Sequence, residues 1–222
     1  MSVKDLVPEK ARSRSGRPKS NEKREQILVA AAIHFVEKGY ELTSMAAVAK
    51  SADVSKLTIY SHFANKADLF KESIQQRCDR QLAPATFNQY AKLPVAEGLL
   101  QLGNMLVTLV FDSDSIRLLR ILHAEATHHP DIVKIFYEAA PQRVKAAFGE
   151  LLKDWAHQGQ LQVADIPLAT EQFFSLLKGE LHVKTMLSLT EKLTTQELDT
   201  HVQACVRLFL AGYQTKNVAG LV

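Results

Sequence analysis

Apolar residues recur every three or four positions along this chain and rarely alternate with polar ones. Ile27, Ala31 and Phe35 are four positions apart near the start, and Val206 and Leu210 keep the same spacing near the end. This period places apolar side chains on one face of an α-helix, whereas a half-buried strand requires strict alternation. Val, Ile and Thr fall within helical periods, so the sequence predicts an all-α fold.

Composition excludes several classes of protein. The 222 residues are 46% hydrophobic and 23% charged, which is typical of a globular protein. Cys78 and Cys205 are far apart, which excludes a disulfide framework and a CxxC metal site. The longest apolar stretch, residues 98–111, is too short to cross a membrane, and the first ten residues lack the apolar core of a signal peptide. Phosphate-binding glycine loops are absent. We expect a cytoplasmic protein without metal, cofactor or membrane span.

Positive charge is concentrated at the N-terminal end. The net charge of the chain is only +3, but residues 1–82 hold 15 Lys and Arg against 10 Asp and Glu, while the remaining 140 hold 12 against 14. Residues 10–19 carry five cations and no acid, and they lack an apolar face. We expect residues 1–19 to be a disordered basic arm.

Capping and helix-breaking residues predict where the helices begin and end. The first helix spans 20–38 and stops at Gly39. Two short helices follow at 44–51 and 55–63, and a fourth runs from Asn65 to about residue 82. The later segments are longer, at 95–111, 115–128, 131–157 with a bend or split at Pro141, 167–189 and 195–215.

The two short helices, joined by residues 52–54, match a helix-turn-helix pattern. A small core is expected from Met45, Val48, Ala49, Ala52, Val54, Ile59 and Phe63. The turn requires a left-handed backbone at Asp53, which Asp tolerates. The second short helix then exposes hydroxyls, a cation and an aromatic OH, which suit a helix end entering the major groove of DNA, and Leu57 suits contact with a thymine methyl. A solvated helical hairpin without function is the alternative.

The segment LTSMAAVAKSADVSKLTIYSHFANKADLF makes this pattern specific. Thr43 and Ser44 open its first helix, and the run Thr58-Ile59-Tyr60 is followed by His62-Phe63. Residues 20–72 thereby resemble the DNA-binding domain of the TetR family of bacterial transcriptional regulators. Two positions depart from the family pattern. Asp53 replaces the usual Gly, and Leu57 stands where Gly, Arg, Gln or Pro is common, which leaves the base specificity undefined.

The resemblance implies which residues contact double-stranded DNA. The expected phosphate contacts are Thr43, Ser44, Thr58, Tyr60, His62 and Lys66, and the expected groove contacts are Ser55, Lys56, Leu57 and Ser61. A packed aromatic is the alternative for Tyr60. Arg17 and Lys19 lie in the basic arm, where Gly16-Arg17-Pro18 resembles the centre of a minor-groove hook. A merely solubilising tail is the alternative for this arm.

The remaining helices resemble the AefR-like branch of the family more loosely, through the Phe136-Tyr137-Glu138 run and through Pro141 and Arg143. The resemblance implies a domain that binds a small-molecule effector and forms a homodimer through its last two helices. The residues expected to line the effector pocket are Met105, His123, Phe148, Trp155 and Phe174. Core packing is the alternative for each. For the residues near His128, a position at a helix end is favoured over a metal site. For the two cysteines, a buried thiol is favoured over a redox sensor.

Together these features predict a disordered arm (1–19), a helix-turn-helix domain (20–66), a connecting helix (67–82) and a larger helical-bundle domain for ligand binding and dimerisation (83–222). The expected function is a ligand-responsive repressor that binds a palindromic operator as a dimer and is released by an apolar effector. It would be cytoplasmic and nucleoid-associated when bound. An architectural or effector-independent DNA-binding protein, an activator and a helical enzyme are the alternatives, although no catalytic constellation is apparent.

Overall fold

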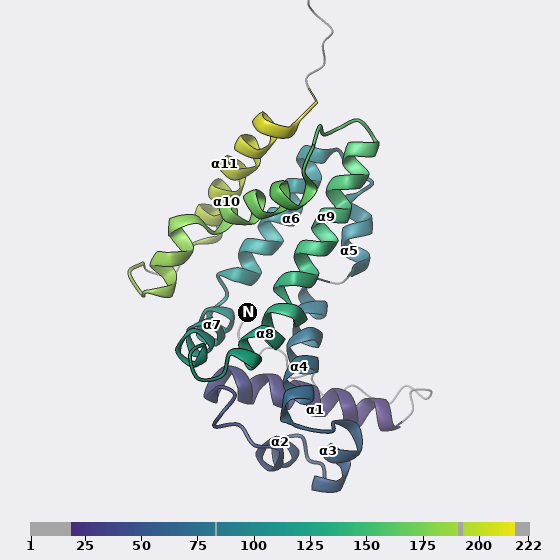
Figure 1. The fold of residues 1–222 in the computed structure, drawn as a ribbon, viewed down its shortest axis with the longest axis vertical. Coiled ribbons are helices and arrows are strands. Elements are labelled where there is room, and N and C mark those ends of the chain that lie inside the picture. The colour runs from purple at the N-terminus through teal and green to yellow at the C-terminus, as the bar shows by residue number, and fades with distance from the viewer. Residues whose placement is uncertain (1–18, 83, 191–192, 216–222) are drawn as a thin grey trace, which may run out of the picture. The chain divides into compact units, whose positions relative to one another are not determined.

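The computed structural model describes residues 19–82, 84–190 and 193–215. These residues form eleven α-helices and no β-strand; the one extended pairing among them is an isolated bridge between Leu161 and Gln214 (Figure 1). The predicted all-α fold is therefore confirmed. The helices are α1 (Lys19–Lys38), α2 (Met45–Ser51), α3 (Lys56–His62), α4 (Lys66–Gln81), α5 (Pro84–Tyr90), α6 (Val95–Val110), α7 (Ser113–Glu125), α8 (Pro130–Ala139), α9 (Pro141–His157), α10 (Ile166–Met186) and α11 (Thr195–Tyr213).

The helices pack into two compact units. Unit 1 takes in the chain up to Gln81 together with residues 112–142, and unit 2 takes in residues 82–111 together with the chain from 143 onward. Unit 1 therefore contains α7 and α8 in addition to the first four helices. The division into DNA-binding and effector-binding parts stays a prediction.

Unit 1 is built around α1, which packs against α2, α4 and α7, while α8 packs on α4. Its core includes an aromatic cluster in which the Phe35 ring meets the Phe70 ring edge-on at 4.9 Å and the Tyr40 ring at 5.9 Å. Phe35 and Phe70 are completely buried. Burial of each such side chain contributes roughly 1.5–3 kcal/mol, so this cluster fixes the helices on which α2 and α3 rest.

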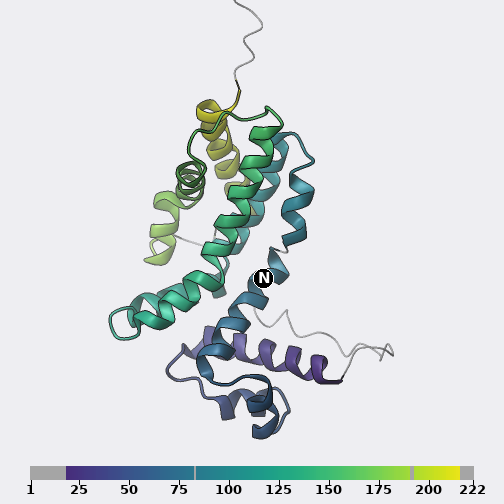
Figure 2. The ribbon, with the colours of Figure 1, turned by 45° about the vertical axis from the view of Figure 1, so that its right-hand side comes forward.

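Unit 2 is built around α6, which packs on α10 and α11 (Figure 2). Helix α9 joins this core through Phe148, whose ring stacks on Phe173 of α10 at 4.7 Å. Close approach needs a small residue on α6, because a Cβ at Gly98 would lie 2.4 Å from Cζ2 of Trp155. Trp155 is fully buried, and its Nε1–H donates to the Leu93 carbonyl at 3.2 Å.

The predicted helix boundaries hold to within a few residues, and the predicted break at Pro141 is confirmed as a split that separates α8 from α9. Two features differ from the prediction. Helix α5, which begins at Pro84, was expected to be a break between helices. Helix α10 contains an unpredicted kink at Gly179, where φ is 47° and ψ is −157°.

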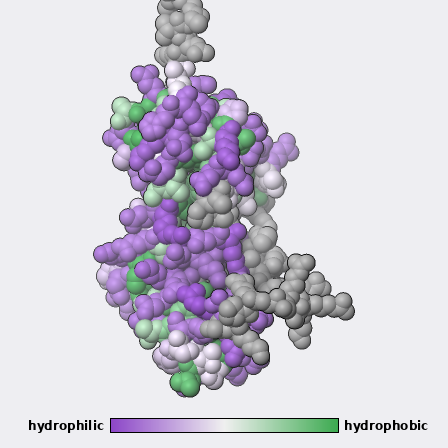
Figure 3. Space-filling view, turned by 90° about the vertical axis from the view of Figure 1, so that its right-hand side faces the viewer, coloured by the Kyte–Doolittle hydropathy of each residue, from purple (hydrophilic) through white to green (hydrophobic). Residues whose placement is uncertain are grey.

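Hydrophilic side chains predominate on the face shown in Figure 3, where hydrophobic side chains form small separate patches. In the described part of the chain, no helix combines the length and the apolar character needed to cross a membrane.

Candidate functional site

Helices α2 and α3 are short, and each begins at a serine cap. Ser44 Oγ accepts from the N–H of Ala47 at 3.2 Å, and Ser55 Oγ accepts from the N–H of Thr58 at 3.0 Å. Between the helices, Asp53 has a φ of 53°, as predicted for the turn. Because each cap satisfies a backbone donor that the helix leaves unpaired, the helix starts are fixed by local sequence.

The core expected beneath α2 and α3 is confirmed. Val48 and Ile59 have no exposed surface, Ala49 is 2% exposed, and α2 packs on α3. Val54 is half-buried and packs against this core, which also includes Met45, Ala52 and Phe63. This packing leaves one face of α3 turned away from the core.

The face of α3 that points away from its core carries the predicted groove residues. Ser55, Lys56 and Ser61 are exposed, and Leu57 is 81% exposed. Tyr60 is 54% exposed, which rules out the packed-aromatic alternative. Thr58 and His62 are half-buried at the edges of this face. We call these seven residues, with Ser44 at the start of α2, the α3 surface. It offers hydroxyls, one ammonium, one imidazole and an exposed aliphatic group.

Thr43, which is expected to contact phosphate, has its hydroxyl bonded within the protein. Thr43 is 2% exposed, and its hydroxyl donates to the carbonyls of Gly39 at 2.7 Å and His34 at 3.2 Å. Gly39, at a φ of 78°, ends α1 as predicted. The Thr43 hydroxyl therefore stabilises the turn between α1 and α2, and its contact with phosphate stays a prediction.

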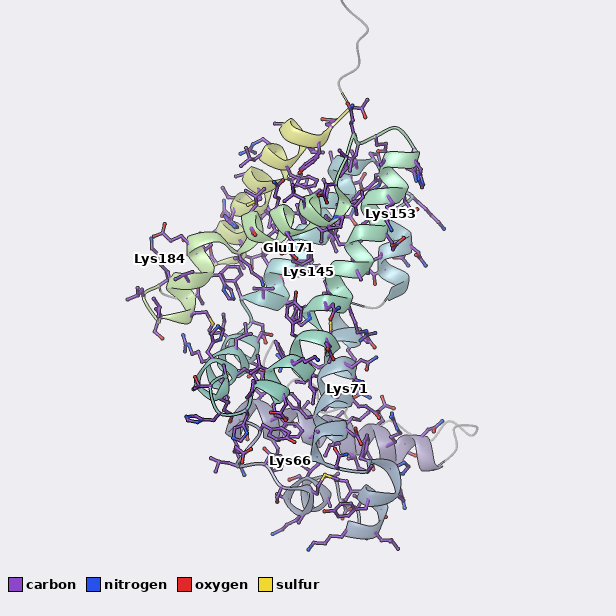
Figure 4. The ribbon with its side chains drawn as sticks, viewed as in Figure 1. Lys66, Lys71, Lys145, Lys153, Glu171 and Lys184 are labelled. Carbon is purple, nitrogen blue, oxygen red and sulfur yellow. The ribbon has the colours of Figure 1, made fainter. Side chains whose placement is uncertain are left out.

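Lys66, which is also predicted to contact phosphate, has its side chain bonded within the protein (Figure 4). Its Nζ donates to the carbonyls of Tyr40 at 2.9 Å and Glu41 at 3.3 Å, and it lies 4.2 Å from the centre of the Tyr40 ring. Burial raises the pKa of Tyr40, with the nearby acids adding to the effect. Lys66 thus fastens the start of α4 to the α1–α2 turn. Arg17 lies outside the described residues, and Lys19 begins α1.

Arginines that support the site were missed at the sequence level. Arg24 lies over the Phe63 ring at 5.2 Å and pairs with Glu72 of α4. Arg77 of α4 pairs with Asp112, with its Nη2 2.8 Å from Oδ2, and both side chains are at least 91% buried. An arginine within an amphipathic helix gives no signal of such burial. The cap-rich sequence that begins at Asp112 is the one hint that was available.

The five predicted pocket residues belong to different units. His123 belongs to unit 1, where it is exposed and its Nδ1 contacts the Leu119 carbonyl at 2.7 Å. The other four belong to unit 2. Phe148 and Phe174 pack within an aromatic core, Trp155 packs on α6, and Met105 Sδ accepts from the Tyr90 hydroxyl at 3.8 Å. Of the five, Phe174 alone is among the residues lining the cavity of unit 2 described below.

Both cysteines are buried, as expected. Burial raises the pKa of Cys205, which disfavours its reactive thiolate form. No group of three or more His, Cys, Asp or Glu side chains suited to a metal ion occurs among the described residues.

Family models match two parts of the chain. Residues 27–73 match the model described as bacterial regulatory proteins, tetR family, and residues 97–215 match the AefR-like transcriptional repressor, C-terminal domain. The transcriptional activator FasR of Mycolicibacterium smegmatis is 38% identical over 66 residues, which are 30% of this chain and 30% of FasR. The first curated relatives are matched over only 30% and 38% of their own lengths.

Solved structures match over nearly the whole chain. A TetR-family regulator from Mesorhizobium loti is 28% identical with a TM-score of 0.78, covering 89% of this chain and 100% of that one. The flavonoid-responsive regulator FrrA is also 28% identical, with a TM-score of 0.69 and coverage of 88% and 99%.

Proposed function

Because the chain belongs to the tetR family of bacterial regulatory proteins, whose members are transcriptional regulators and not enzymes, we propose that it is a cytoplasmic repressor. As a homodimer it binds a palindromic operator, and a small apolar effector releases it. Residues 20–66 read the DNA, residues 67–82 form the helix that connects the two domains, and residues 83–222 bind the effector and dimerise.

The observation that carries this proposal is the α3 surface. Short hydroxyl side chains let the backbone approach DNA closely, Lys56 supplies a phosphate or base contact, and Leu57 presents an apolar group of the size that contacts a thymine methyl. Leu57 at 81% exposure and Tyr60 at 54% exposure have no packing role that would explain their positions. Arg17 and Lys19 then add salt-dependent affinity from the arm.

Two helices of unit 2 supply the surface for dimerisation. Leu168, Val183 and Leu187 of the α10 segment and Leu208 of α11 are at least 50% exposed, although all are apolar. A second copy related by a two-fold axis would cover them in a four-helix contact. The dimer then presents two α3 surfaces to two half-sites that are separated by a turn of DNA. A single module of this size buries too little surface to bind DNA with the selectivity of an operator-binding protein.

The comparisons support a regulated repressor. The model that covers more than half of the chain describes a repressor, and one relative of 28% identity is described as flavonoid-responsive. In this proposal, the effector favours a form whose connecting helices hold the two α3 surfaces at the wrong separation for the operator, to the extent that it binds that form more tightly. Activation is the second candidate, because FasR is described as an activator.

Fluorescence anisotropy with a duplex from the region upstream of the protein's own gene tests the proposal. Binding should weaken steeply as salt rises. Lys56→Ala should reduce the salt slope by about one, and Leu57→Ala should weaken binding to this duplex more than to an unrelated one. Lys134→Ala, an equivalent change at an exposed lysine of α8, is the control. Absence of salt-dependent binding, or equal effects of Lys56→Ala and Lys134→Ala, would refute it. A promoter-reporter assay separates repression from activation.

A further inference from the structure

Unit 2 contains a small cavity between α6 and α10. Its volume is about 10 Å³, roughly the space for one water molecule. Six of the residues that line it are apolar, and the seventh is a lysine; they are Leu106, Val107, Val110, Phe111, Phe174, Leu177 and Lys178. An apolar ligand would bind at a cavity of this composition if the walls moved apart to admit it.

Lys178 is the one charged group among these lining residues. In the described part of the chain, no carboxylate lies within ion-pair distance of it. Glu171, whose charge acts on Lys178, is held by Lys145, whose Nζ donates to both carboxylate oxygens at 2.7 and 2.8 Å (Figure 4). Burial, together with the charge of Lys145, lowers the pKa of Lys178. A partly buried cation without an anion is costly, and an anionic group beside it would remove that cost.

The next residue, Gly179, interrupts α10 directly after the residues that line the cavity. Its φ of 47° kinks α10, and a Cβ there would meet nothing within 4 Å, so backbone conformation and not space is what requires a glycine. Carbonyls just before the kink bond to α11, because Cys205 Sγ–H donates to Leu176 O at 3.2 Å and His201 Nε2 lies 2.9 Å from Leu177 O. The part of α10 that lines the cavity precedes the kink and is thereby held on α11, and after the kink the His182 ring meets the Phe111 ring edge-on at 5.5 Å.

We propose that the effector is an amphipathic acid, whose apolar body enlarges the cavity between α6 and α10 and whose carboxylate pairs with Lys178. This inference rests on the proposed function, because it names the chemical class of the effector that releases the operator.

Ligand binding tests the inference without DNA. Thermal-shift and calorimetric titrations of the full chain use hexanoate, decanoate and dodecanoate, each beside the alcohol of equal length. At least one acid should bind and raise the Tm, and its alcohol should bind about tenfold more weakly, since one charge-assisted hydrogen bond is lost. Lys178→Met should weaken acid binding about tenfold and leave the alcohol unchanged. The matched control is Lys184→Met, on the same helix but in an exposed pair with Glu180.

Binding of no acid, equal binding of acid and alcohol, or an unchanged affinity in Lys178→Met would overturn the inference. Operator binding measured in parallel separates the two proposals: if DNA binds but no acid does, the effector class is wrong, and if an acid binds but DNA does not, the proposed function is wrong.

Discussion

The buried pair of Arg77 and Asp112 allows a quantitative prediction about stability. The two side chains are 9% and 3% exposed, and Nη2 lies 2.8 Å from Oδ2. Arg77→Met keeps the apolar stem and leaves the Asp112 carboxylate buried without its cation. Removing one partner of such a pair costs about 3–5 kcal/mol in the free energy of unfolding. This is a large part of the roughly 5–15 kcal/mol that stabilises a typical domain.

A double-mutant cycle separates the charge pairing from the second role of Asp112. Asp112 Oδ2 also accepts from the N–H groups of Asp114 and Ser115 at 3.2 and 3.3 Å and so caps α7. Asp112→Asn keeps a capping oxygen and removes the charge. Arg77→Met combined with Asp112→Asn should therefore be less destabilised than the sum of the single variants by about 2 kcal/mol, because no unpaired buried charge remains.

Urea unfolding followed by far-ultraviolet circular dichroism measures all variants at one pH and salt concentration. Arg80→Met is the matched control, because Arg80 lies on the same helix and pairs with Glu25 at 3.3 Å, with side chains 32% and 38% exposed. That variant should cost no more than about 1 kcal/mol. The reasoning fails if Arg77→Met and Arg80→Met have the same effect, or if the two single changes are additive.

Three further outcomes follow from local geometry. Burial lowers the pKa of His34 below its ordinary 6.5, so the unfolded chain binds more protons than the folded chain just below pH 6.5. The contribution of His34 to the Tm should therefore be constant above about pH 6.5 and fall as the pH drops toward the folded pKa. His34→Gln should flatten this pH dependence of the Tm. Asp53→Gly should raise the free energy of unfolding by up to about 1 kcal/mol, because Gly adopts a φ of 53° without strain; an unchanged value in urea unfolding would contradict this. Gly98→Ala should destabilise by about 1–3 kcal/mol through collision with Trp155, whereas Gly212→Ala, with open space around it, should not; equal Tm values for these two variants would be the contrary result.

Local signals carried the sequence-level predictions that the structure confirms. Ser44 and Ser55 cap their helices through their own side chains, and Asp53 tolerates the required backbone, so α2 and α3 are encoded within a few residues of each helix end. Pro141 marks a helix boundary for an equally local reason, because its ring prevents a continuous helix.

Features that depend on distant residues were not predictable in the same way. Thr43 is buried because the end of α1 supplies the carbonyls that it bonds, and a motif records only that a hydroxyl occupies the position. Aromatic residues such as Phe148, which packs on Phe173, have the same helical spacing whether they fill a core or line a pocket, so the spacing does not distinguish the two roles. Gly179 lies within a helical period, and nothing nearby in the sequence specifies its positive φ.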